Sequence, residues 1–263
     1  MDLQLTGKRA LVSGSTAGIG FATAQSLLAE GAEVIVNGRT EAAVAKTIAA
    51  MKDATGRVAL GFAGDLSKAE AARELARQFP DVDILVNNLG IFEPKPFEDI
   101  PDEDWQRFFD VNVLSGVRLC RQYLGGMKAR NWGRIVFISS ESALQIPKEM
   151  IHYGTTKTAQ LAVARGLAED VAGTGITVNS VLPGPTRTRG VVDFVGELTK
   201  GSGQSFEAFE TEFFAHVRPT SLIKRFADPS EVASLVTYLV SPLASATTGA
   251  AVRVEGGVVK AIT

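Results

Sequence analysis

Tyr153, Lys157 and Ser140 are the residues of this chain whose types and spacing most clearly indicate chemistry. Tyr153 and Lys157 are four residues apart, so on a helix their side chains share one face. A lysine ammonium near a phenol favours the phenolate, and we therefore expect the pKa of Tyr153 to lie below its usual ~10. Such a phenol could exchange a proton near neutral pH. Because Tyr-x-x-x-Lys pairs also arise by chance, the assignment depends on the rest of the sequence.

The segments around these residues alternate between strand and helix patterns, which predicts a parallel sheet covered by helices. Short stretches rich in Val and Ile, without Pro, predict strands at 9–13, 33–37, 58–62, 84–87, 134–139, 177–181 and 250–254. Helices are predicted at 18–30, 41–55, 68–78, 102–129, 152–172 and 229–240. The expected fold is a doubly wound, Rossmann-type α/β domain spanning 1–263, with one mostly parallel seven-stranded sheet and helices on both faces.

Residues 185–227 form an unusually long connection between a predicted strand and a predicted helix. The segment holds several phenylalanines, and Phe206, Phe209 and Phe213 have helical spacing. A Gly-Ser-Gly run at 201–203 resembles a hinge. We interpret the segment as a substrate lid with its own short helix. The alternative is a small structural subdomain that packs on the core.

A glycine-rich turn follows the first predicted strand, with Gly14, Gly18 and Gly20 in a Gly-x-x-x-Gly-x-Gly spacing. Glycines allow a tight turn and a close approach of the backbone to a pyrophosphate, and the helix that follows directs its positive end there. We therefore expect this turn to bind a dinucleotide cofactor. The residues between the glycines that we include in the binding turn are Ser15, Thr16 and Ile19.

The end of the second predicted strand, Asn37-Gly38-Arg39, indicates which dinucleotide is bound. Folds that prefer NAD usually carry an acidic residue here to bind the ribose hydroxyls, and none is present. The planar guanidinium of Arg39 suits a phosphate. We therefore expect NADP(H) rather than NAD(H), with Arg39 on the 2′-phosphate. The alternative is an ordinary exposed arginine in a loop.

The composition argues against several other functions. The net charge of −2, without a basic block, makes nucleic acid an unexpected partner. No stretch approaches the ~20 apolar residues that span a bilayer, and no signal peptide pattern is present, so we expect a cytoplasmic protein without a membrane partner. One cysteine, Cys120, suits a reducing compartment. Two histidines without nearby Cys or His partners argue against a metal site.

With these motifs in order along the whole chain, the sequence resembles the short-chain dehydrogenase/reductase family in its common form of about 250 residues. Besides the glycine turn, the resemblance rests on Asp65-Leu66, Asn87-Asn88-Leu89-Gly90, Asn112, Ser139-Ser140, Tyr153 with Lys157, and Pro183-Gly184-Pro185-Thr186. Leu89 departs from the pattern, because the family usually has Ala there. The resemblance also implies a homotetramer.

The resemblance implies a role for each matching residue. Asp65 would accept from the adenine amino group beside the Leu66 backbone, and Asn87 and Gly90 would line the adenosine. Asn112 would hold a water in a proton relay. Ser140 would bind the substrate carbonyl, a role for which Ser139 competes, and Tyr153 would exchange the proton. Lys157 would also hold the nicotinamide ribose. The residues expected to flank the nicotinamide are Pro183, Gly184 and Thr186.

These features predict an NADP(H)-dependent oxidoreductase acting on a small-molecule carbonyl/alcohol pair, similar to a 3-oxoacyl-acyl-carrier-protein reductase or a general ketone reductase. Apolar residues near the site, including Leu144 and Met150, indicate a substrate with an apolar body. Lys148, Arg187 and Arg189 could instead meet an anionic group. Two alternatives remain: a sugar or polyol dehydrogenase, and a non-catalytic dinucleotide-binding sensor or scaffold.

Overall fold

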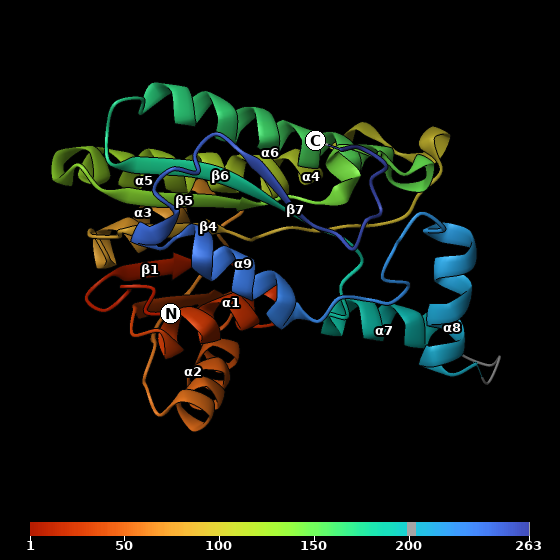
Figure 1. Ribbon diagram of the computed structural model, residues 1–263, viewed down its shortest axis with the longest axis horizontal. Helices are drawn as coiled ribbons and strands as arrows, with labels where there is room; N and C mark the ends of the chain where they lie inside the picture. Colours follow the sequence, from red (N-terminus) through yellow and green to blue (C-terminus); the bar gives the residue numbers. More distant parts are fainter. Residues whose placement is uncertain (199–203, 263) are drawn as a thin grey trace.

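A computed structural model describes residues 1–198 and 204–262. Within them, one sheet holds seven strands, all of them parallel, in the order β3-β2-β1-β4-β5-β6-β7 (Figure 1). The strands are β1 (Arg9–Val12), β2 (Glu33–Gly38), β3 (Leu60–Ala63), β4 (Ile84–Asn87), β5 (Gly133–Ile138), β6 (Ile176–Pro183) and β7 (Ala251–Val254). The predicted doubly wound fold is confirmed.

Helices cover both faces of this sheet (Figure 1). Their bounds are α1 (Gly18–Ala29), α2 (Glu41–Thr55), α3 (Ala69–Gln78), α4 (Asp102–Phe109), α5 (Ser115–Arg130), α6 (Ile151–Asp170), α7 (Arg189–Leu198), α8 (Phe206–Glu212) and α9 (Pro229–Leu239). None of the described helices is both long and apolar enough to cross a membrane.

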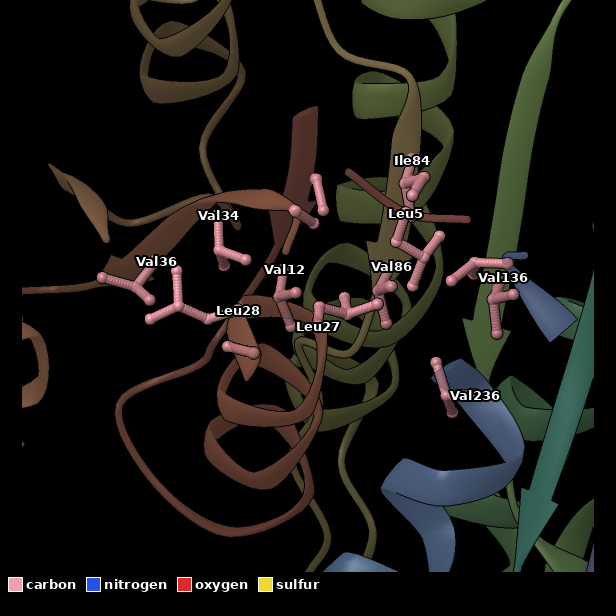
Figure 2. Packing of buried hydrophobic residues seen from close by; sticks show 14 of the residues in the cluster. Leu5, Val12, Leu27, Leu28, Val34, Val36, Ile84, Val86, Val136 and Val236 are labelled. Carbon is pink, nitrogen blue, oxygen red and sulfur yellow. The ribbon is translucent and has the colours of Figure 1, made fainter. Parts of the chain in front are cut away.

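Alternate strand residues enter two separate apolar cores, as the period of two in a strand requires. Val12, Val36 and Val86 lie in the core that α1, α2 and α9 cover, and Figure 2 shows Val12 and Val86 beside Leu27 of α1. Their neighbour Leu11, with the strand residues that follow the same pattern, lies in the core under α3, α5 and α6. The sheet is therefore buried on both faces, which explains the continuous apolar runs in its strands.

The predicted helix at 102–129 is wrong in one respect, because a π-helical turn, η2 (Asp110–Leu114), separates α4 from α5. The buried side chain of Asn112 bonds to the backbone of Ile91, which lies outside the helix. The Asn112 carbonyl oxygen accepts a hydrogen bond from Gln160 of α6. These tertiary contacts accompany the wider turn, and helical periodicity alone does not reveal such contacts.

The segment 185–227 contains α7, α8 and a second π-helical turn, η5 (Phe213–Val217), at one end of the sheet (Figure 1). Phe213 and Phe226 stack with ring centroids 5.1 Å apart, and Phe214 contacts both rings edge-on. The segment therefore has a small aromatic core of its own. The predicted hinge at 201–203, and the side chain of Phe194, lie outside what the structure describes. The action of the segment 185–227 as a substrate lid remains a prediction.

Candidate active site

The site begins where the strand order reverses, between β1 and β4. The Ser13 hydroxyl oxygen at the end of β1 accepts hydrogen bonds from the backbone N–H groups of Asn88 (2.9 Å) and Leu89 (3.0 Å). The Asn88 side chain donates in return to the carbonyls of Ser13 (2.9 Å) and Gly14 (3.1 Å). A cavity of about 250 Å³ lies between the two connected loops. Such a crevice is where open parallel sheets bind ligands.

The glycine turn fits a pyrophosphate group. Gly14 (φ +61°) and Gly18 (φ +58°) have left-handed backbones that disfavour other residues. A Cβ on Gly20 would lie 2.4 Å from the Asn88 side chain. Helix α1 starts without a side-chain cap and without an acidic residue in its first turn. Its first N–H groups and positive dipole end are therefore suited to an anion. The predicted residues that line this cavity are Gly14, Gly18, Ile19, Gly20 and Gly90.

Ser15 and Thr16 have different places in the turn. Ser15 is fully buried, and its hydroxyl oxygen accepts from the backbone N–H of Asn37 at 2.8 Å. Asn37 in turn accepts from the backbone N–H of Gly14 at 3.0 Å. Both residues thus hold the turn against β2. Thr16 instead lies over Gly38, where an added Cβ would approach its methyl group to 2.5 Å. Asn37 was missed in the sequence, because a strand pattern does not show which loop its side chain meets.

Arg39 is exposed and directly follows Gly38, the last residue of β2. No hydrogen bond or ion pair joins its side chain to the part of the chain that the structure describes. Its five N–H donors are therefore open to a ligand.

The residues predicted on the adenosine side differ in their burial and in their hydrogen-bond partners. Asp65 is exposed, and its carboxylate accepts from the backbone N–H of Ser67 at 3.0 Å, while the Leu66 side chain is buried in the core. Asn87 is buried and donates to the Cys120 sulfur at 3.5 Å. Leu89 packs partly into the core under α3 and α5.

A second cavity, of about 430 Å³, contains Ser140 and Tyr153. The three residues predicted beside the nicotinamide, Pro183, Gly184 and Thr186, line the same cavity. Ile19 and Thr188 border both cavities, so the second continues from the first. The arrangement could place a substrate between a bound dinucleotide and the Tyr153 hydroxyl.

The two adjacent serines at the end of β5 have different partners. Ser139 donates its hydroxyl to the Lys157 carbonyl oxygen at 2.9 Å, so its side chain is held against α6. Both serines line the cavity, but Ser140 donates to the Glu141 carboxylate at 2.7 Å and is hydrogen-bonded to Tyr153. This geometry favours Ser140 over Ser139 as the residue that contacts substrate.

The expectation that Lys157 lowers the pKa of Tyr153 is wrong for the protein by itself. Burial raises the pKa of Tyr153, and the smaller effect of its hydrogen bond with Ser140 opposes this. Burial also lowers the pKa of Lys157 to about 7, so Lys157 is protonated in only part of the molecules near neutral pH. The Lys157 ammonium lies 5.5 Å from the Tyr153 ring centroid and donates to the Ile138 carbonyl oxygen at 2.9 Å. Burial therefore outweighs the charge effect.

Asn112 is held by protein partners on α6, and its role in holding a water stays a prediction. Its side-chain amide donates to the Thr156 hydroxyl oxygen at 2.9 Å. The backbone carbonyl oxygen of Asn112 accepts from the Gln160 side chain at 2.5 Å. The side-chain oxygen of Gln160 accepts from the Lys157 ammonium at 3.3 Å. Gln160 was missed, although it lies three residues after Lys157 and so near it on the helix. Together these residues join Lys157 to the η2 turn.

The cavity also holds two charged residues that the sequence analysis missed, Glu141 and Arg218. Their ion pair is almost fully buried, with 3.0 Å between Arg218 Nε and Glu141 Oε1. The position of Glu141 directly after Ser140 was a usable signal. No local pattern could have indicated Arg218, which lies 77 residues away in sequence.

Comparison with known proteins agrees with this geometry. A family model described as enoyl-(acyl carrier protein) reductase matches residues 14–259. This chain belongs to the short-chain dehydrogenase/reductase family. Among members of the family, an uncharacterized oxidoreductase of Bacillus subtilis, YvaG, is 50% identical over the full length of both chains. The 3-oxoacyl-[acyl-carrier-protein] reductase FabG of Aquifex aeolicus is 33% identical and is matched over 98% of this chain and 99% of its own.

Among solved structures, L-sorbose reductase of Gluconobacter frateurii, complexed with NADPH and L-sorbose, superposes with a TM-score of 0.93. Its sequence is 31% identical, and the match covers all of both chains. Membership of the family makes this protein an NAD(P)-dependent oxidoreductase that acts on CH–OH/C=O groups.

Proposed function

We propose that this short-chain dehydrogenase/reductase uses NADP(H) to interconvert a carbonyl and an alcohol whose substrate body is apolar. The observation that carries the proposal is the second cavity, where Ser140 and Tyr153 meet a largely apolar wall. The wall includes Met150 of the 3-10 turn before α6, and Phe209 and Phe213 of the segment 185–227. Such a surface favours an apolar substrate.

The proposed reaction uses three side chains. When bound, the dinucleotide supplies or accepts the hydride. In the direction of reduction, Tyr153 donates a proton to the substrate oxygen. Ser140, once its hydroxyl turns from Glu141 to the substrate, stabilises the negative charge that develops there. Lys157 lies behind Tyr153 and is held by Ile138 and Gln160, so its ammonium can stabilise the phenolate that remains.

The Tyr153 pKa determines which form of the side chain is present before ligands bind. Since burial raises this pKa, Tyr153 is protonated at neutral pH and ready to donate. Oxidation would need the phenolate, which Lys157 must then stabilise. We infer that a bound dinucleotide and substrate change the surroundings of both groups before the proton moves.

The preference for NADP(H) rests on Arg39. Arg39 is exposed directly after β2, and its guanidinium has no hydrogen-bond or ion-pair partner among the residues that the structure describes. The NADPH in the related sorbose reductase structure is consistent with this preference.

A sugar or polyol substrate is the second candidate. It is favoured by the likeness to L-sorbose reductase and by the polar group formed by Glu141, Glu149 and Arg218 in the same cavity. A non-catalytic sensor remains less supported, because Ser140, Tyr153 and Lys157 are assembled with specific hydrogen bonds.

The proposed function is tested by NADPH oxidation with a panel of ketones, 3-oxo esters and ketoses, followed spectroscopically. We expect Tyr153→Phe to lower turnover at least about a hundredfold, since the proton donor is lost. Its affinity for NADPH should stay near that of the wild type. Tyr238→Phe, an exposed tyrosine on α9, is the matched control and should keep full activity. Normal turnover by Tyr153→Phe would remove Tyr153 from its proposed role.

A further inference from the structure

Glu141 and Arg218 place charge in the substrate cavity that the proposed reaction does not use. Glu141 is 4% exposed and Arg218 is 9% exposed. Glu141 comes from the 3-10 turn that directly follows Ser140, and Arg218 comes from the end of η5. Charges so deeply buried are costly unless they are paired and hydrogen-bonded, so their arrangement in the cavity needs an explanation.

The hydrogen bonds of Glu141 use both of its carboxylate oxygens. Oε1 accepts from Arg218 Nε at 3.0 Å. Oε2 accepts from the hydroxyls of Ser140 at 2.7 Å and Ser142 at 2.5 Å. A second carboxylate, that of Glu149, lies 3.5 Å from Arg218 Nη1. The guanidinium is therefore already engaged by two acidic residues.

The charged groups on the described wall of this cavity are Glu141, Glu149 and Arg218. Two carboxylates face one guanidinium, which leaves one net negative charge. The buried Glu141–Arg218 pair is neutral as a pair, and the remaining carboxylate, that of Glu149, is 40% exposed. A negatively charged substrate would find the guanidinium already engaged and would be repelled by this remaining carboxylate. A neutral carbonyl compound meets no such penalty.

The other cations considered for this cavity, Lys148, Arg187 and Arg189, lie outside its described wall. Arg187 stacks over the Phe206 ring at 4.3 Å, and Arg189 lies 3.6 Å from Asp193 of its own helix. Neither these two arginines nor Lys148 is among the residues of the cavity wall. Lys157 lies behind Tyr153, with its ammonium bonded to Ile138 and Gln160. The alternative that Lys148, Arg187 and Arg189 meet an anionic group therefore has no support from this geometry.

We propose that the Glu141–Arg218 pair makes the cavity selective for carbonyl substrates that carry no free negative charge, a proposal that rests on the proposed function. The Glu141 carboxylate is paired with the Arg218 guanidinium, which would otherwise be able to bind a substrate carboxylate. It also accepts the Ser140 hydroxyl, so the same residue links substrate selection to the orientation of Ser140.

The test compares one neutral compound and one anion that share a reacting carbonyl, methyl 3-oxobutanoate and 3-oxobutanoate. We expect wild-type protein to reduce the ester with a kcat/KM at least about tenfold above that of the anion. In Glu141→Gln, Arg218 loses its main partner, and the ratio should shift toward the anion by at least about tenfold. In Arg218→Gln, the ratio should shift further toward the ester.

The readout is the ratio of the kcat/KM values for the ester and the anion. A single rate would not suffice, because either substitution can slow the reaction by disturbing Ser140 or by lowering the stability of the protein. Opposite shifts in two variants cannot come from partial unfolding, which lowers both activities together. A wild-type preference for the anion, or an unchanged ratio in Glu141→Gln, would overturn the proposal.

The same two compounds also distinguish a failure of this proposal from a failure of the proposed function. If the wild type oxidises NADPH with no compound of the panel, the proposed function fails. Binding of the ester and the anion to the protein with NADP⁺ is then measured by calorimetry. Selective binding of the ester, lost in Glu141→Gln, would support the charge selection. Equal binding, preferential binding of the anion, or binding of neither would overturn it.

Discussion

Lys157 and Tyr153 show at the residue scale how burial changes the chemistry of a side chain. Both lie in α6, Lys157 buried and Tyr153 half-buried at the wall of the substrate cavity, and the charged form of either group is disfavoured there. The pKa of Tyr153 therefore rises and that of Lys157 falls, although the two are one helical turn apart. In the ligand-free protein the proton therefore stays on Tyr153, and we expect bound ligands to change the surroundings of both side chains.

Arg39 provides a prediction at the same scale. We expect Arg39→Ala to raise the Kd for NADPH at least about tenfold, because a charge-assisted bond to the 2′-phosphate is lost. The Kd for NADH should hardly change. Fluorescence titration with each nucleotide measures both values.

Arg57→Ala is a suitable control, since Arg57 is an exposed arginine just beyond α2 and away from both cavities. Equal weakening of both nucleotides in Arg39→Ala, or of neither, would mean that Arg39 does not bind the 2′-phosphate.

At the element scale, the close approach of β6 and β7 positions one wall of the substrate cavity. The backbone N–H of Gly184, directly after β6, donates to the Val254 carbonyl oxygen at 3.2 Å. A Cβ on Gly184 would lie 2.6 Å from the Glu255 carbonyl oxygen and 2.8 Å from its Cα. These backbone atoms cannot move away without disturbing the strand pair.

Gly184→Ala should therefore lower the free energy of unfolding by about 2 kcal/mol or more, through overpacking. Gly166→Ala is the matched change, because Gly166 lies within α6 and a Cβ there meets no atom within 4 Å. It should raise stability by about 0.5–1 kcal/mol through helix propensity. Urea unfolding measures both. A Gly184→Ala protein as stable as the wild type would contradict the packing argument.

At the scale of the whole molecule, the two apolar cores share the strands of a single sheet. Leu11 and Val12 are neighbours in β1, yet one belongs to each core. Loss of either core would expose one face of every central strand. The aromatic core of the segment 185–227 is joined to the rest through Phe226, two residues before the cap of α9.

We therefore expect the chain to unfold as one cooperative unit, as a single domain should. Far-UV circular dichroism and the fluorescence of Trp105 and Trp132 should give the same urea midpoint at each protein concentration. The two tryptophans report on α4 and on the start of β5. Separate midpoints for the two signals would show that part of the chain folds independently.

The sequence by itself determined the parallel sheet, most helix bounds, the glycine turn and the spacing of Ser140, Tyr153 and Lys157. These features are local, because strand periodicity, turn glycines and the helical repeat act over a few residues. Only the tertiary structure decided the direction of the Tyr153 pKa and the position of the η2 turn, since both depend on burial and on contacts between elements. The pairing of Glu141 with Arg218 is likewise tertiary. Its partners are 77 residues apart, and only the fold brings Arg218, directly after η5, to Glu141, which follows Ser140.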